Sequence, residues 1–272
     1  MRIVRTIAQL RETLRPQRGR GMIGLVPTMG AFHDGHVALM QAARGECDSV
    51  VVSLFVNPTQ FGASEDLDSY PRDFDGDVAV AADVGADLVF APAVEEMYPE
   101  RFQTWVEVEQ LSQRMEGAAR PGHFRAVATV CLKLFTIVRP DRAYFGQKDA
   151  QQVAVVERMA HDLALELEIR VVPTVRDADG LALSSRNVHL TPVQREAALS
   201  LPRALAAGRE AHDGGAHADA VARTLLVGAR ARGVELDYVE TARLGERLVL
   251  AGAIRVGSTR LIDNVILEGA LE

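Results

Sequence analysis

The chain has 272 residues, with 30 lysines and arginines against 37 aspartates and glutamates, so its formal net charge is −7. Hydrophobic residues make up 48% and charged residues 25%, a composition typical of a folded protein and not of a disordered one. The acidic balance argues against broad binding to nucleic acid or anionic lipid, because both need a surplus of positive charge. At this length we expect one large domain, or one large and one small domain.

Localisation signals are weak throughout the chain. The longest apolar stretch, residues 126–138, is shorter than a membrane span and contains Lys133. No apolar segment of signal-peptide length follows Met1. Two cysteines, Cys47 and Cys131, are too few for a disulfide framework or a thiolate metal site. We therefore predict a cytoplasmic protein that does not bind membranes.

Short apolar runs alternate with helical patterns in the first part of the chain. β-Branched residues dominate residues 49–56, which is typical of a buried parallel strand. The patterns predict strands at residues 22–26, 49–56, 87–90, 143–145 and 167–172, and helices at residues 35–44, 75–84, 123–138 and 149–163. This alternation predicts an α/β fold, a Rossmann-like parallel sheet with helices on both faces.

The pattern changes after Val175. Residues 191–209 and 217–232 predict two successive helices, and three extended runs follow at residues 236–241, 247–250 and 259–267. Helices followed by closely spaced strands indicate a smaller α+β domain with an antiparallel sheet. We therefore predict a Rossmann-like domain at residues 1–175 and an α+β C-terminal domain at residues 176–272.

Residues 27–36 carry the strongest motif, Pro-Thr-Met-Gly-Ala-Phe-His-Asp-Gly-His, between a predicted strand and a predicted helix. The carboxyl edge of a parallel sheet binds ligands, and a helix N-terminus there suits phosphate. Gly30 and Gly35 would let the backbone approach a nucleotide, and His33 and His36 can project to one side. The alternative is a pair of surface histidines on a helix cap. A zinc site is disfavoured because no further spaced ligands accompany the pair.

Three other polar blocks follow predicted strands or loops. The amides of Asn57 and Gln60 suit a small hydroxy acid, although Pro58 also favours an ordinary polar turn. Lys148 could pair with phosphate, or be a solvated surface lysine. Asp149 is a good helix N-cap, which gives it a purely structural alternative. The run Leu-Ser-Ser-Arg at residues 183–186 would by itself be a solvated loop.

These blocks together resemble the HxGH nucleotidyltransferase superfamily and, over almost the whole chain, the pantoate–β-alanine ligase family. The blocks that carry the resemblance are residues 27–36, 55–61, 70–72, 139–141, 145–149, 173–176 and 183–187. The resemblance implies ATP-dependent condensation of (R)-pantoate with β-alanine to pantothenate, AMP and pyrophosphate, through a pantoyl adenylate. It also implies ATP as co-substrate, Mg²⁺ and a homodimer.

The resemblance assigns roles to individual residues. Catalysis would rest on His33, His36, Lys148 and Arg186. Gln60 and Gln152 would bind pantoate, with Gln60 near the β-alanine site and Asn57 beside it. The ATP-binding residues would be Met29, Gly30, Ala31, Phe32, His33, Asp34, Gly35, His36, Gly146, Gln147, Lys148, Asp149, Val175, Leu183, Ser184, Ser185 and Arg186. Arg186 lies near the domain boundary, so closure of the C-terminal domain as a lid could deliver it.

The chain departs from the family pattern at four positions. Leu183 replaces a common Met, Ala126 a common Gly, and Ala150 a larger aromatic residue. Gly76 interrupts the acidic patch Asp73, Asp75 and Asp77, which lies near the bound metal in the family. For that reason we assign no metal ligand.

Two other functions stay open. A nucleotidyltransferase that stops at nucleotide transfer would not need β-alanine, and a nucleotide-binding module without catalysis would release no pyrophosphate. A Ser-His-Asp hydrolase, a P-loop kinase and a dinucleotide oxidoreductase are disfavoured because their motifs are missing. A tRNA synthetase is disfavoured by the short acidic chain.

Overall fold

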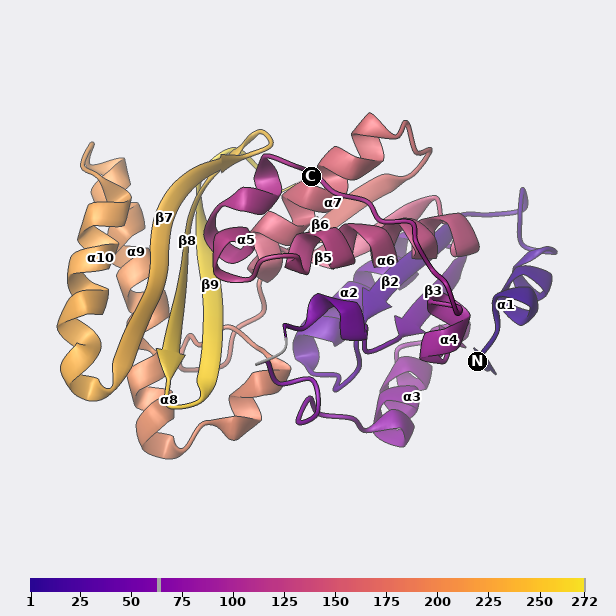
Figure 1. Ribbon diagram of the computed structural model, residues 1–272, viewed down its shortest axis with the longest axis horizontal. Coiled ribbons are helices and arrows are strands. Elements are labelled where there is room, and N and C mark those ends of the chain that lie inside the picture. Colours follow the sequence, from indigo (N-terminus) through magenta and orange to yellow (C-terminus); the bar gives the residue numbers. More distant parts are fainter. Residues whose placement is uncertain (63–64, 272) are drawn as a thin grey trace.

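The computed structural model describes residues 1–62 and 65–271, which form two sheets with their covering helices (Figure 1). Within these residues the first sheet is parallel and has six strands in the order β1-β4-β3-β2-β5-β6. The strands are β1 Arg2–Val4, β2 Ile23–Thr28, β3 Ser49–Leu54, β4 Leu88–Phe90, β5 Arg142–Gly146 and β6 Glu168–Val172. Parallel strands separated by helices confirm the predicted α/β class.

Helices cover both faces of this sheet. On one face α1, α6 and α7 pack against Leu25 and Val51, and on the other α2 and α3 pack against Val26, Val50 and Val52. Alternate residues of one strand thus point to opposite cores, which explains why the β3 sequence is apolar without interruption. The helices of this part are α1 Ile7–Leu14, α2 Asp34–Glu46, α3 Phe74–Asp83, α4 Val94–Met97, α5 Met115–Ala119, α6 His123–Val138 and α7 Ala150–Asp162.

The strand order places a switch point between β2 and β5. From β2 the chain proceeds outward to β3 and β4, whereas β5 and β6 extend the sheet on the opposite side. In doubly wound sheets the crevice outside the carboxyl ends of such strands is the usual ligand site. The histidine motif follows β2 and the segment containing Lys148 follows β5, so both lie at this switch point.

The C-terminal part contains a second, antiparallel sheet of β7 Val234–Leu244, β8 Arg247–Val256 and β9 Thr259–Glu268. One face packs on α9 Ser200–Asp213 and α10 Ala218–Gly228, with α8 Pro192–Ala198 at the edge of the same core. Residues of the sheet also pack with Met115 of α5 and Ala154 of α7. The sheet therefore lies between α9 and α10 on one side and the α5–α7 region on the other (Figure 1).

The structure corrects parts of the predicted secondary structure. The single helix predicted over residues 191–209 is two helices, α8 and α9, which meet at Leu199. Pro202 lies in the first turn of α9, where its missing N–H is tolerated, but it could not continue a helix from α8. The helix predicted to Arg232 ends at Gly228 and continues as the 3₁₀ turn Ala229–Arg232. Strands β7 and β8 are longer than predicted, and β1, α1, α4 and α5 were not predicted.

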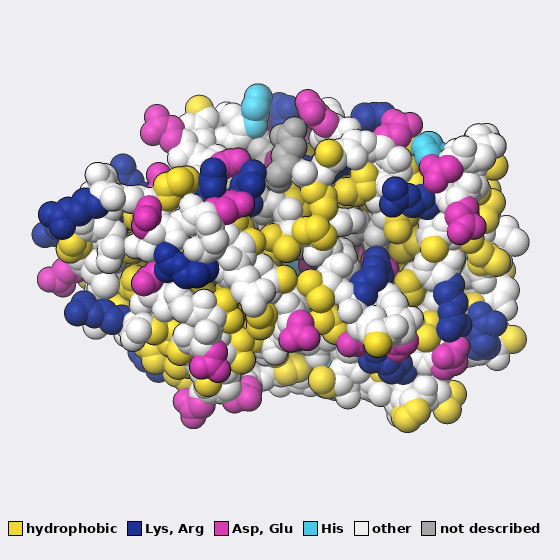
Figure 2. All heavy atoms as spheres, turned by 180° about the vertical axis from the view of Figure 1, so that it is seen from behind, with side chains coloured by type: hydrophobic (Ala, Val, Ile, Leu, Met, Phe, Trp, Pro, Cys, Tyr) yellow, Lys and Arg dark blue, Asp and Glu magenta, His cyan; other side chains and the backbone are white. Residues whose placement is uncertain are grey.

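Charged side chains of both signs are mixed over the surface that Figure 2 shows, and they do not form separate fields there. Cys47 and Cys131 are both buried and unpaired, as expected of cysteines that pack in a core.

Among the helices of residues 1–62 and 65–271, we found none that combines the length and hydrophobicity of a membrane span.

Candidate active site

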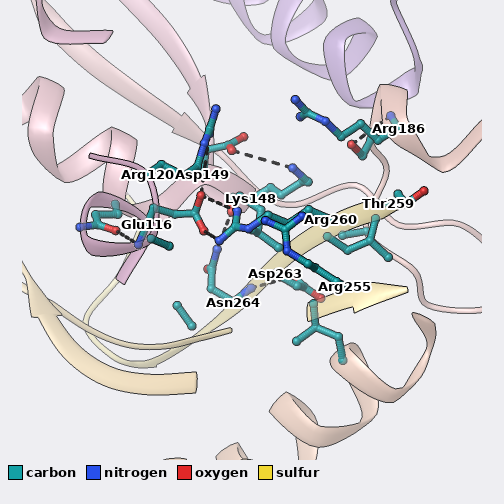
Figure 3. A pocket seen from close by; sticks show the side chains of 18 of the residues that line it. Glu116, Arg120, Lys148, Asp149, Arg186, Arg255, Thr259, Arg260, Asp263 and Asn264 are labelled. Carbon is teal, nitrogen blue, oxygen red and sulfur yellow. Dashed lines mark hydrogen bonds and ion pairs between the residues drawn. The ribbon is translucent and has the colours of Figure 1, made fainter. Parts of the chain in front are cut away.

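A cleft with two adjoining chambers lies at the carboxyl ends of β2 and β5. The smaller chamber has a volume of about 240 Å³ and the larger about 830 Å³. Lys148, Asp149, Gln152 and Arg186 line both chambers and so mark the passage between them. Figure 3 shows the larger chamber, with Arg186 on one side and Glu116 and Arg120 on the other.

The smaller chamber collects most of the residues that the sequence predicted for the site. They come from the ends of β2, β3 and β5 and from the loop after β6. Its lining includes Met29, His33, Gly35, His36, Asn57, Gln60, Gly146, Lys148, Asp149, Gln152, Val175, Leu183, Ser184, Ser185 and Arg186. Segments far apart in the sequence therefore meet at one edge of the sheet.

His33 and His36 form the start of α2 as well as part of the cleft wall. Their ring centroids lie 4.2 Å apart. The N–H of Gly35 donates to Nδ1 of His33 at 3.1 Å, and the N–H of His33 donates to Nδ1 of His36 at 3.4 Å. Since Nδ1 accepts in both rings, each neutral imidazole carries its proton on Nε2. The pair does cap a helix, as the alternative interpretation held, but both rings are partly buried and line the cleft.

Burial keeps both imidazoles neutral. Desolvation, followed by the charge of Lys148, lowers the pKa of His33 to about 4. Desolvation, followed by His33 and Lys148, lowers the pKa of His36 to about 3. Near neutral pH each ring therefore offers one uncharged N–H donor.

Asp77 shapes the turn between β2 and α2. Its carboxylate accepts from the N–H of Ala31 at 2.9 Å and of Phe32 at 2.7 Å, and Asp77 is only 4% exposed. Gly30 has φ +87°, and a Cβ there would lie 2.7 Å from an Asp77 oxygen, so the turn requires glycine. The Asp77 side chain thus holds the histidine motif in place by accepting hydrogen bonds from the backbone of the motif.

Gln60, in the 3₁₀ turn after β3, is held by its neighbours. Nδ2 of Asn57 donates to Oε1 of Gln60 at 3.1 Å, while Nε2 of Gln60 lies 3.0 Å from Sδ of Met29. Asn57 is 1% exposed and also accepts from Thr59, so it shapes the turn, as the alternative interpretation of this block held. In the smaller chamber Asn57 therefore orients the Gln60 amide.

Two residues that the sequence did not single out hold the backbone of Gln60. Nδ1 of His123 lies 2.9 Å from the Gln60 carbonyl oxygen, and Arg120 donates to the same oxygen at 3.3 Å. Desolvation and then Arg120 lower the pKa of His123 to about 4, so the neutral ring donates from Nδ1. Arg120 also forms an ion pair with Glu65 at 2.6 Å. No local pattern distinguishes these residues, because only packing of α5 and α6 brings them to Gln60.

Lys148 and Asp149 project from the turn between β5 and α7. The Asp149 side chain, although at the start of α7, makes no capping hydrogen bond to any described residue. Asp149 thus stands at the N-cap position without the side-chain hydrogen bond that the structural interpretation expects. Its carboxylate lies 3.8 Å from Nζ of Lys148 and lines both chambers. The side-chain exposure of Lys148 is 20%, so it is not a freely solvated lysine.

Arg186 enters the cleft from the 3₁₀ turn Ser185–His189. Its guanidinium donates to both oxygens of Asp66, at 2.6 and 2.8 Å. Tyr70 lies beneath this pair, with its ring centroid 5.7 Å from the guanidinium carbon and its hydroxyl 3.4 Å from Oγ of Ser185. Oγ of Ser184 accepts from the N–H of Arg186 at 3.3 Å. Tyr70 belongs to a block that carried the family resemblance but had no assigned role.

Five residues of the predicted ATP-binding set do not line either chamber of the described structure. They are Gly30, Ala31, Phe32, Asp34 and Gln147. The first three form the turn that Asp77 holds, and Asp34 is exposed in the first turn of α2. The Gln147 side chain points instead toward Asn264 of β9, at 3.3 Å. Their contact with ATP therefore stays a prediction from the family resemblance.

A metal site was sought among the His, Cys, Asp and Glu side chains of the described residues. Within residues 1–62 and 65–271, no three or more His, Cys, Asp or Glu side chains are grouped so as to hold a metal ion. The Asp77 carboxylate, the most buried of the acidic patch, is occupied by two backbone N–H groups. A divalent cation would fit here only as an ion held mainly by substrate phosphates, which is common for Mg²⁺.

A doubly wound parallel sheet with histidine, lysine and arginine donors at its switch point defines a nucleotide-binding α/β protein. Comparison with known proteins narrows this class. The model of the pantoate–β-alanine ligase family matches residues 2–266. The pantothenate synthetase of Moorella thermoacetica is 52% identical, over 98% of this chain and 99% of that relative. That of Pelotomaculum thermopropionicum is 50% identical with similar coverage.

Solved structures agree with the sequence relatives. The crystal structure of pantothenate synthetase from Thermus thermophilus has a TM-score of 0.92 and 46% identity, covering 99% of this chain and all of that one. The pantoate–β-alanine ligase from Francisella tularensis, complexed with β,γ-ATP and β-alanine, has a TM-score of 0.86 and 35% identity, covering 99% of both chains. The chain therefore belongs to the pantoate–β-alanine ligase family, whose members are enzymes.

Proposed function

We propose that this enzyme condenses (R)-pantoate with β-alanine at the expense of ATP, giving pantothenate, AMP and pyrophosphate. The observation that carries the proposal is the convergence of His33, His36, Lys148 and Arg186 on one cleft at the switch point. Family membership and a related ligase complexed with a β,γ-ATP and β-alanine support the substrates. The two-step route through an adenylate is what the family resemblance implies, and we propose it on that basis.

In the first step a carboxylate oxygen of pantoate attacks the α-phosphorus of ATP. The bond from this phosphorus to the bridging oxygen breaks, and pyrophosphate leaves. Negative charge moves to the departing oxygens, where donors stabilise it most strongly inside a dry cleft. The Nε2–H groups of His33 and His36 would contact the triphosphate, with His36 at the reacting phosphate. Lys148 and Arg186 would neutralise charge from the other side of the passage.

In the second step the amine of β-alanine attacks the carbonyl carbon of the pantoyl adenylate. The carbon–oxygen bond to AMP breaks, and the amine loses a proton. Adenylation is needed because a free carboxylate has no good leaving group. The route requires no covalent nucleophile from the chain, so catalysis would come from orientation and charge stabilisation.

Pantoate would lie in the smaller chamber against the amides of Gln60 and Gln152. Asn57 would fix the orientation of the Gln60 amide, and the carbonyl of Gln60 is held from behind by Arg120 and His123. An amide offers a donor and an acceptor, which matches a substrate with hydroxyl and carboxylate groups.

Four further expectations belong to this proposal. Mg²⁺ would be held by ATP phosphates, and it would supply charge neutralisation at the triphosphate. The enzyme would be a cytoplasmic homodimer. Residues 176–272 would form a domain that acts as a lid over the ATP site held by residues 1–175. Neither nucleic acid nor a membrane would be a partner.

Pyrophosphate release tests the proposal and separates it from its alternatives. We expect AMP and pyrophosphate to form in equal amounts when ATP, pantoate and β-alanine are present together, with no nucleotide retained in the product. A transferase that stops at nucleotide transfer would leave AMP attached to its product. A binding module would bind ATP without releasing pyrophosphate, and either result would refute the ligase.

A further inference from the structure

Asn264 of β9 holds the backbone of the segment that carries Lys148. Its Nδ2 donates to the carbonyl oxygens of Gln147 at 2.9 Å and of Lys148 at 2.8 Å. Its Oδ1 accepts from Nε2 of Gln147 at 3.3 Å. Asn264 is only 2% exposed, and it lies beside Lys148 in the larger chamber (Figure 3). One buried amide therefore fixes two consecutive peptide groups of the turn after β5.

The preceding residue, Asp263, holds the segment that begins at Val175 and leads to Arg186. Its carboxylate accepts from Arg176 at 2.7 and 2.9 Å, and its Oδ1 also accepts from the N–H of Asn264 at 2.8 Å. Asp263 is only 3% exposed, whereas the side chain of Arg176 is 30% exposed. Arg176 directly follows Val175, which lines the smaller chamber.

Arg176 in turn anchors the loop that leads to Arg186. It donates to the carbonyl oxygen of Gly180 at 3.1 Å and forms an isolated antiparallel bridge with Ala182. The N–H of Leu183 donates to the carbonyl oxygen of Val175 at 3.0 Å. The start and the end of this loop are therefore fixed together, immediately before Ser184 enters the cleft.

We propose that Asp263 and Asn264 are positioning residues. They hold the Lys148 segment and the Val175–Arg186 segment in the relative position in which both contact the same triphosphate. This inference rests on the proposed function. Lysine is a point charge on a flexible stem, so its placement depends on a fixed backbone. A site built from two loops keeps its geometry only when supporting hydrogen bonds join them. Two adjacent residues of β9 provide that junction.

An alternative explanation is that Asp263 and Asn264 merely dock the second sheet. The chain offers a matched control in the ion pair between Arg247 of β8 and Glu157 of α7. That pair also joins the second sheet to the first part of the chain, and its side chains are 15% and 27% exposed. Arg247 and Glu157 line neither chamber of the described cleft. A pure docking role predicts equal effects at both places.

The experiment compares Asn264→Ala, Asp263→Asn and Arg247→Met in the full-length enzyme. Asn264→Ala should lower kcat/KM for ATP in pantoate-dependent pyrophosphate release by about 10- to 100-fold, the usual loss for a supporting hydrogen-bond partner. Asp263→Asn keeps the shape of the side chain and should lower the same quantity by at least about 10-fold. Arg247→Met should stay within about threefold of the parent, because it leaves both loops intact.

A double-mutant cycle with Lys148→Ala tests whether Asn264 acts through Lys148. In the Lys148→Ala background, Asn264→Ala should cause a further loss of less than about threefold. Losses that multiply in the double variant would overturn the proposal, as would equal losses in Asn264→Ala and Arg247→Met. If Asn264→Ala does not fold, Asp263→Asn against Arg247→Met decides the question.

ATP binding measured by calorimetry separates this inference from the proposed function. A parent that releases no pyrophosphate with pantoate would refute the proposed function. Even then, the inference requires weaker ATP binding in Asn264→Ala than in Arg247→Met. The inference alone would be refuted by a different result. In that case the parent is active, and the folded Asn264→Ala and Asp263→Asn variants keep the kcat/KM and the Kd for ATP within about threefold of the parent.

Discussion

Arg186 donates two hydrogen bonds to Asp66, of 2.6 and 2.8 Å, inside the cleft where phosphate would bind. The hydrogen bond from Arg186 is also the main reason why the pKa of Asp66 is lowered. A carboxylate and a phosphate oxygen present the same kind of acceptor to a guanidinium. If Arg186 binds ATP phosphate through the same Nε and Nη2 groups, as we propose, the phosphate must displace Asp66.

Removal of the Asp66 charge should favour ATP. In Asp66→Asn we expect the Kd for ATP to fall by about three- to tenfold, because a partly exposed ion pair is worth about 1 kcal/mol. Calorimetric titration with ATP measures the change. Asp68→Asn, which alters a nearby charge of the same kind without touching Arg186, is the control. An unchanged or weaker affinity in Asp66→Asn alone would contradict this displacement of Asp66.

Arg186 itself should be indispensable for turnover. Arg186→Ala removes a donor from the departing pyrophosphate, and we expect kcat to fall by about 10²- to 10³-fold, the usual loss for one donor to a developing charge. Arg186→Lys should recover only part of this loss, because an ammonium does not reproduce the planar fork. Steady-state pyrophosphate release gives both values, and near-normal turnover in Arg186→Ala would refute the role.

His36 should act on the adenylation step. His36→Ala removes the Nε2–H donor at the reacting phosphate, and we expect a fall of about 10²- to 10³-fold in the rate of adenylate formation. Rapid-quench measurement of pyrophosphate in a single turnover isolates this step from the second one. Adenylate formation at close to the parent rate would exclude the assignment.

The two roles of His33 can be separated by choice of substitution. Asn is a favoured N-cap, so His33→Asn should retain the start of α2, whereas His33→Ala should lose about 1 kcal/mol of stability. Both variants lack the Nε2–H donor, and both should lose activity. Urea unfolding and pyrophosphate release, measured on the same samples, test this division. Full activity in His33→Asn would show that His33 is only a cap.

The neutral histidines should make the fold sensitive to acid. His33 has a folded-state pKa of about 4, well below the value near 6.5 of an unfolded chain. Between these values the unfolded state binds more protons, so stability falls as pH drops from about 6.5 toward 4. When the pH is lowered from 7.5 to 5.5, the free energy of unfolding of His33→Asn should fall by about 1 kcal/mol less than that of the parent, as measured by urea unfolding. Equal losses would show that His33 titrates normally.

The sheet and its helices could be predicted because the burial of an element determines which of its positions are apolar. Residues 50–52 are apolar and β-branched since both faces of β3 are covered, and α6 follows its predicted bounds because its apolar stripe has helical spacing. Strand β1 has three residues and only Val4 is buried, so it leaves no pattern. The sequence predicted α8 and α9 as a single helix because the helical spacing of apolar residues continues across the break at Leu199.

The candidate site divides in the same way. His33 and His36 share one motif, and Lys148 and Arg186 stand in two others. The strand order brings the first two of these three motifs to one edge of the sheet, at the ends of β2 and β5. The supporting residues carry no such signal. Arg120 reaches Gln60 across 60 positions of sequence, and Asn264 reaches Gln147 across 117, through packing that no local pattern encodes.

Transfer of an isotope from pantoate to AMP tests the central claim most directly. If a pantoate carboxylate oxygen bonds to the α-phosphorus in this cleft, it stays on that phosphorus when β-alanine displaces AMP. With pantoate labelled by ¹⁸O in its carboxylate, mass spectrometry of the products should find one labelled oxygen in each AMP. AMP without label, formed together with pantothenate, would contradict activation of the acid as an adenylate.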